Sequence, residues 1–334
     1  MTRRITDRLA RAARRLRRAL GDGVPRAALA GGLALTACQP VPEQVDLSPT
    51  PEPRPRVTTA SLGTPSEASR STALYYRRIE QRLLSAGLLR QDSGERDFPL
   101  DSTTLARNFE RIAMFSEYTQ IGGRYVAQQS RAQLRRWEGP VRVQLHFGDS
   151  VSAADRAGDE ALMRAYVARL RRVSGHPIEM VTSGGNYHVF VASVDEQAQL
   201  GPDIRAIEPG LSRSTVREIT TLGRSTYCAV YASSAAERPY AYVSAIALIR
   251  SEHPDLMRRS CYHEELAQGL GLANDSPLAR PSIFNDDEEF ALLTRHDELL
   301  LRMLYDRRLR VGMTAEQARP VVDRIAAELV GGPV

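Results

Sequence analysis

The stretch CYHEELAQGLGLAND, residues 261–275, decides how this chain is interpreted. Its apolar residues Tyr262, Leu266 and Leu270 recur every four positions, which is the period of one buried helix face, while most of the side chains between them are polar. Gly271 is suited to the C-terminal end of a helix. The stretch therefore predicts an amphipathic helix that ends at Gly271 and is followed by a turn.

The same stretch contains the beginning of a zinc-protease pattern without its completion. Two histidines four residues apart, with a glutamate after the first, bind zinc from one helix face. Here Glu264 follows His263, but the position four residues after His263 holds Ala267. A metal site in that frame fails, and His263 is expected to be a hydrogen-bonding structural residue.

The chain around this helix predicts a mixed sheet with long helices, an α+β fold. Residues 141–148 alternate apolar and polar side chains as a strand does, and residues 241–249 are almost wholly apolar, as expected of a central strand. A long amphipathic helix is predicted at 153–175. Two further strands are predicted within 178–194, and one within 225–233.

Residues 73–138 are predicted to be a helical N-terminal segment. One helix starts at Ala73, and a second starts at the cap candidates Asp101 and Ser102 and continues through residue 118. A third, short helical stretch is expected to end at Trp137.

Residues 139–334 are predicted to form the α+β domain. Near its end, an acidic stretch from Asn285 predicts a helix with an acidic first turn. Residues 314–317, TAEQ, match a capping box that begins the last helix. Pro320 is expected to kink that helix.

Residues 1–37 have the pattern of a secretory signal peptide: an arginine-rich start, then an apolar stretch too short to span a bilayer. Residues 35–38, LTAC, resemble the bacterial lipobox, so Cys38 is the predicted lipidation site. An ordinary signal peptide with a chance cysteine is the alternative. Gln39 follows the cysteine, which favours the outer membrane by the sorting rule of Gram-negative lipoproteins. Residues 38–72, rich in Pro, Ser and Thr, are predicted to be a disordered tether.

The basic charge of the chain lies in its first residues. The formal net charge is +5, but residues 1–37 hold nine of the 45 basic residues and two of the 40 acidic ones. The remainder has 36 basic and 38 acidic residues, a net charge of −2. Nucleic acid is therefore not expected as a partner. The expected partners are the membrane, through Cys38, and an envelope protein or peptide.

The three cysteines fit an exported protein. Lipidation of Cys38 leaves Cys228 and Cys261, and a pair of cysteines in an oxidising periplasm usually forms a disulfide. The alternative is a pair of thiolate metal ligands. It is less favoured because neither cysteine has the paired spacing C-x-x-C.

Moving the helix frame by one residue reveals a resemblance to the metzincin metallopeptidases. In their signature, a His-Glu-x-x-His helix ends at a glycine and a third histidine follows. Glu264, Gln268 and Asn274 stand where the three zinc histidines would be. Glu265 stands at the position of the general base, and Asp275 occupies a place where some metzincins carry an acid.

The resemblance continues downstream and covers residues 139–310. PSIFND, residues 281–286, resembles the Ser-Ile-Met turn beneath the metzincin zinc site, with Phe284 in place of the methionine. HDELLLRMLYD, residues 296–306, resembles the closing helix. The whole combination is also similar to a proteobacterial lipoprotein family that carries domain of unknown function 2927. That family name implies no activity.

The exchanged ligands separate two hypotheses. A carboxylate and two amides bind a divalent ion more weakly than three imidazoles do, and Glu265 without a metal-bound water is a poor base. The leading hypothesis is a non-catalytic peptide- or protein-interaction module with a metzincin-like core and no cofactor. The alternative is a hydrolase or peptidase, with Glu265 as general base. In it, Glu264, Gln268 and Asn274 or Asp275 would hold zinc or another divalent metal. A solvated helix face would have the same composition.

Two other motifs are weaker. FGDSVS, residues 147–152, resembles the nucleophile turn of SGNH-type esterases. No histidine of this chain has the required aspartate three residues before it, so Ser150 is expected to be a loop or helix-cap residue. NDDEEF, residues 285–290, has the acids of a calcium loop without its spacing or glycine, and is expected to be an acidic helix start.

Overall fold

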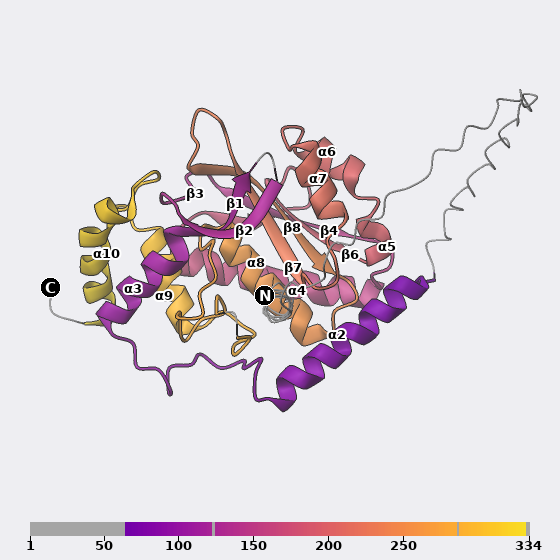
Figure 1. Ribbon diagram of the computed structural model, residues 1–334, viewed down its shortest axis with the longest axis horizontal. Coiled ribbons are helices and arrows are strands. Elements are labelled where there is room, and N and C mark those ends of the chain that lie inside the picture. The colour runs from indigo at the N-terminus through magenta and orange to yellow at the C-terminus, as the bar shows by residue number, and fades with distance from the viewer. Residues whose placement is uncertain (1–63, 122–123, 286, 332–334) are drawn as a thin grey trace, which may run out of the picture. The chain divides into compact units, whose positions relative to one another are not determined.

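The computed structural model describes residues 64–121, 124–285 and 287–331 (Figure 1). The predicted signal peptide, the lipidation site Cys38 and most of the predicted tether lie outside these residues. No helix in the described part of the chain has the length and apolar character needed to cross a bilayer.

A mixed six-stranded sheet forms the centre of the described part, which confirms the predicted α+β class. The strands follow the order β3-β8-β6-β4-β5, with β7 antiparallel to β8 and the other neighbours parallel. The strands are β3 (Arg136–Trp137), β4 (Val141–Phe147), β5 (Ile178–Met180), β6 (Tyr187–Ala192), β7 (Cys228–Ser234) and β8 (Ala241–Arg250). β8 pairs with β3, β6 and β7. This agrees with the prediction that residues 241–249 form a central strand.

Helices cover both faces of this sheet (Figure 1). Because side chains alternate along β6, Val189 and Val191 face a large core cluster, while Phe190 faces a smaller one. The large cluster includes residues of α4 (Ala153–Ser174), α8 (Asp255–Gly269) and α9 (Arg295–Leu304). The smaller cluster includes residues of α6 (Gly201–Ile207) and α7 (Arg213–Thr220).

The first described helix, α2 (Glu67–Ser85), begins before its predicted start at Ala73. Ser66 caps it, because its side chain accepts a hydrogen bond from the backbone N–H of Ser69. The Ser66 hydroxyl also donates to Asp195, at 2.6 Å, in the short helix α5 (Val194–Gln197). The end of the predicted tether is therefore helical and in contact with the domain.

The prediction of helix up to Trp137 is wrong. Helix α3 (Ser102–Ala113) ends early, and β1 (Phe115–Ile121) and β2 (Arg124–Arg131) then form an antiparallel hairpin. The sequence accounts for the hairpin. Aromatic and β-branched residues flank two glycines at 122 and 123, which is a hairpin signal stronger than the helical period in this stretch.

The predicted start of the next-to-last helix is also wrong. The described residues of the acidic stretch from Asn285 are not helical, and α9 begins at Arg295. Thr294 and Asp297 form a reciprocal capping box there, and this fixes the start. The last helix, α10 (Ala315–Val330), begins at the predicted capping box and contains Pro320.

Candidate functional site

Helix α8 carries most of the candidate residues and depends on α2 for its start. Pro254 occupies the N-cap position and supplies no side-chain cap. Instead, the carboxylate of Glu80 in α2 accepts a hydrogen bond from the backbone N–H of Met257, at 3.1 Å. The predicted apolar stripe is buried, as expected: Tyr262, Leu266 and Leu270.

The end of α8 admits only glycine at two positions. A Cβ on Gly269 would lie 2.1 Å from the hydroxyl oxygen of Tyr187 in β6. At Gly271, φ is +123°, and a Cβ would lie 2.3 Å from the carbonyl oxygen of Arg135. The two glycines therefore allow the helix end to lie directly against β6 and against the segment that precedes β3.

His263 is a structural residue, as expected. Its ring is buried and stacks on Tyr166, with ring centroids 3.9 Å apart. Its Nδ1 accepts a hydrogen bond from the backbone N–H of Leu293, at 3.1 Å. Burial lowers the pKa of His263 to about 3, so the imidazole is neutral at pH 7.

The predicted disulfide is present: Cys228 of β7 is bonded to Cys261 of α8. Beside it lie Glu264 and Glu265, and ligand atoms of these two residues and of Cys228 all lie within 4.8 Å of one another. A disulfide sulfur has no thiolate charge, so this group offers a cation two carboxylates at most. Glu265 is buried, with 3% of its surface exposed.

The remaining predicted ligands use their amides inside the protein. Gln268 donates from Nε2 to Oδ1 of Asp275, at 3.0 Å. Asn274 is completely buried and donates from Nδ2 to the carbonyl oxygen of Arg111, at 2.7 Å. Its backbone N–H donates to the carbonyl oxygen of Ile112, at 3.1 Å. The structure thus brings Gln268 to Asp275, and it ties Asn274 to the end of α3.

The turn at residues 281–285 is held by one buried carboxylate. Asp297 of α9 accepts hydrogen bonds from the Ser282 hydroxyl, at 2.5 Å, and from the backbone N–H of Ile283, at 3.1 Å. It also accepts from the backbone N–H and the hydroxyl of Thr294. Phe284, at the position compared above with a methionine, is completely buried in the same core cluster as the apolar stripe of α8.

One buried polar contact of α8 was not predicted. Oδ2 of Asp159 in α4 accepts a hydrogen bond from the Tyr262 hydroxyl at 2.9 Å, and its Oδ1 lies 3.2 Å from Nε of Arg258. Burial raises the pKa of Asp159, while Arg258 opposes this rise. The signal was present in the sequence, because Asp159 lies on the same helical stripe as Met163 and Tyr166.

Ser150 is a loop residue and not the cap of α4. Its hydroxyl donates to Oε2 of Glu196, at 2.7 Å, and its backbone N–H donates to Oε1 of the same carboxylate. The side chain of Ser152 caps α4 by accepting from the backbone N–H of Asp155. This arrangement gives Ser150 a hydrogen-bond acceptor but pairs it with a carboxylate, in place of the histidine of an SGNH-type site.

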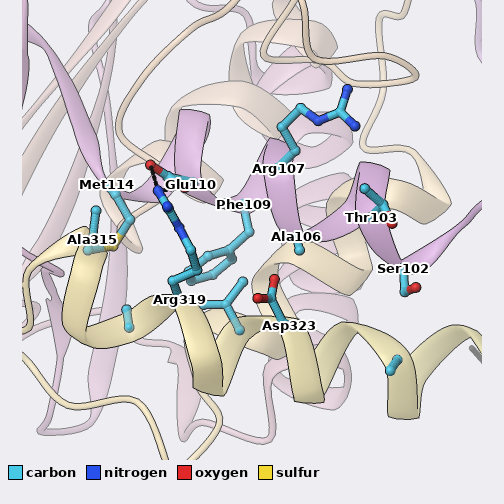
Figure 2. Close-up of a pocket in the computed structure, with 13 residues that line it drawn as sticks. Ser102, Thr103, Ala106, Arg107, Phe109, Glu110, Met114, Ala315, Arg319 and Asp323 are labelled. Carbon is cyan, nitrogen blue, oxygen red and sulfur yellow. Dashed lines mark hydrogen bonds and ion pairs between the residues drawn. The ribbon is translucent and has the colours of Figure 1, made fainter. Parts of the chain in front are cut away.

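A groove of about 430 Å³ lies between α3 and α10 (Figure 2). Its floor contains the buried side chains of Phe109 and Val322. At its rim, Arg319 of α10 is paired with Glu110 of α3 at 3.0 Å, and Asp323 lies further along α10. Because the apolar side chains of this groove are buried and its exposed side chains carry charges of both signs, the groove is suited to a polar or charged peptide segment.

Comparison with known proteins identifies one family. The family model described as "Protein of unknown function (DUF2927)" matches residues 102–324. No curated protein and no solved structure shows significant similarity to the chain. The match covers every described strand and all the candidate residues of α8, and it begins after α2. Because it spans more than half of the sequence, the chain belongs to the DUF2927 family.

Proposed function

We propose that this protein is a cell-envelope lipoprotein whose folded domain is a non-catalytic peptide- or protein-interaction module. The lipobox at Cys38 supports the anchor. The disulfide supports export, because such bonds persist in oxidising compartments. The groove between α3 and α10 supports an interaction role, since it offers exposed side chains of both charges to a peptide.

The observation that carries the non-catalytic assignment is the donor set beside α8. Among the described residues, the group of His, Cys, Asp and Glu side chains whose ligand atoms converge there consists of Glu264, Glu265 and Cys228, and Cys228 is bonded to Cys261. Two carboxylates bind a divalent ion weakly compared with the three imidazoles of a zinc-peptidase site. Asn274 is completely buried, and its Nδ2 donates to the carbonyl oxygen of Arg111 of α3, which supports a structural role for the turn after α8.

The competing hydrolase hypothesis rests on the acidic pair Glu264 and Glu265. Metal analysis of the purified chain separates the two hypotheses. We expect the zinc content of the protein and of its Glu264→Ala variant to be the same, because Glu264 holds no resident ion in our proposal. Stoichiometric zinc that is lost in Glu264→Ala, but kept in Glu237→Ala on an exposed loop, would support the hydrolase and overturn our proposal.

The lipid anchor gives a second prediction. The Cys38→Ser variant is expected to move from the membrane fraction to the soluble periplasmic fraction, because the thioether to the lipid cannot form. Fractionation followed by immunoblotting measures this, and Cys228→Ala is the control that retains the lipidated cysteine. Membrane association of Cys38→Ser equal to that of the unmodified sequence would refute the anchor.

A further inference from the structure

Two histidines lie side by side on the sheet face that α6 and α7 partly cover. His146 belongs to β4 and His188 to β6, and the parallel register pairs His146 with Phe190 and Gln144 with His188. The two imidazoles are therefore diagonal neighbours on one face. Nε2 of His146 lies 3.0 Å from Nδ1 of His188.

Both rings are held in place by their surroundings. His146 stacks on Phe190, with ring centroids 4.6 Å apart and an interplanar angle of 17°. His188 has 7% of its surface exposed, and the backbone of Gly185 forms a hydrogen bond with its ring. A backbone partner on an imidazole ring is the usual means by which proteins orient a metal-binding histidine. The exposed carboxylate of Asp203, in α6, acts electrostatically on His146.

We propose that His146 and His188 together bind one divalent transition-metal ion of the copper(II) type, through Nε2 of His146 and Nδ1 of His188. Metal–nitrogen bonds of about 2.0–2.1 Å and the observed separation of 3.0 Å give an angle of about 91–97° at the ion. This is the angle between neighbouring ligands in a square-planar or tetragonal site, which copper(II) and nickel(II) prefer. A tetrahedral zinc site would separate the nitrogens by about 3.3–3.4 Å.

The protonation states of the pair are compatible with binding. Burial lowers the pKa of His188 to about 4 and also lowers that of His146, so both rings are neutral at pH 7, as metal ligands must be. In the metal-free protein, the distance of 3.0 Å fits a hydrogen bond between the rings. When the ion binds, the proton on Nε2 of His146 moves to Nδ1 of the same ring. Both imidazoles therefore stay neutral. Water can complete the coordination.

The test uses the full chain without a histidine tag. Titration with copper(II) against a competing chelator is expected to show one tight site, with electron paramagnetic resonance couplings from two imidazole nitrogens. His146→Gln is expected to lower the copper(II) affinity by more than about 100-fold. Loss of a residue that only orients a ligand typically costs about 10–100-fold, and His146 is itself a ligand in our proposal. His176→Gln is the matched control, because His176 lies outside this pair and contacts Gly139. Its copper affinity should be unchanged.

A stability measurement guards against a misfolded variant. Copper(II) should raise the melting temperature of the unmodified chain and of His176→Gln, but not that of His146→Gln, because only a folded site is stabilised by its ligand. Circular dichroism of metal-free His146→Gln should match that of the unmodified chain. The proposal is overturned by the absence of a tight site, by equal affinity in His146→Gln, or by a signal without two imidazole nitrogens.

Discussion

Reduction of the Cys228–Cys261 disulfide is expected to lower the free energy of unfolding by about 3–4 kcal/mol. The bond joins β7 to α8 across a sequence separation of 33 residues. Without the bond, the unfolded chain gains conformational entropy, because residues 228 and 261 are no longer held together. The folded chain keeps its packing around Cys261, so the unfolded state becomes relatively more stable. Denaturant unfolding with and without a dithiol reductant measures the loss as a lower midpoint.

The double variant Cys228→Ala/Cys261→Ala provides the matched control for this experiment. It should start from the lowered stability and should not respond to the reductant, because the remaining cysteine, Cys38, has no partner within the chain. The expectation fails if the unmodified chain unfolds at its original midpoint after alkylation has shown both thiols to be free. In that case, contacts that already form in the unfolded state would replace the loop entropy.

The central sheet could be predicted from the sequence because its signals are local. The residues of β4 alternate between two environments, and β8 is buried along most of its length. Both patterns are visible in a run of seven to ten residues. The helix α8 and its glycine end were predictable for the same reason, since one stripe of apolar side chains and one glycine specify it.

The predicted secondary structure was wrong where two local sequence patterns favoured different elements. Residues 115–131 combine a helical spacing with aromatic and β-branched side chains, and pairing between β1 and β2 decided the outcome. The acidic residues after Asn285 are suited to the first turn of a helix, but Glu289 forms ion pairs with arginines outside such a helix. Glu289 pairs with Arg90, at 3.2 Å, and with Arg280, at 2.7 Å. The helix begins later, where Thr294 offers a complete capping box.

The candidate site could be located from the sequence, but its contacts could not. The contact between Asn274 and Arg111 joins residues 163 positions apart, and no local pattern indicates it. The approach of His146 to His188 depends on the register between the parallel strands β4 and β6. Sequence spacing therefore names the polar side chains near a site, and the tertiary structure determines which of them face one another.

Replacing Asp297 by alanine is expected to lower the free energy of unfolding by about 3–5 kcal/mol, the largest effect predicted for a single side chain of this region. Asp297 is completely buried, and its carboxylate accepts four hydrogen bonds. The substitution would leave the backbone N–H groups of Ile283 and Thr294 buried without acceptors. It would also remove one half of the capping box of α9. Denaturant unfolding measures the loss.

Two further variants show whether the carboxylate itself is responsible. Asp297→Asn keeps the shape and one acceptor oxygen, so its loss should be smaller, about 1–3 kcal/mol. Glu237→Ala removes an acid from an exposed loop and should change stability by less than about 0.5 kcal/mol. If Asp297→Ala is no less stable than Glu237→Ala, then the turn at residues 281–285 does not depend on Asp297. The link between α9 and the core beneath α8 must then come from the packing of Phe284 alone.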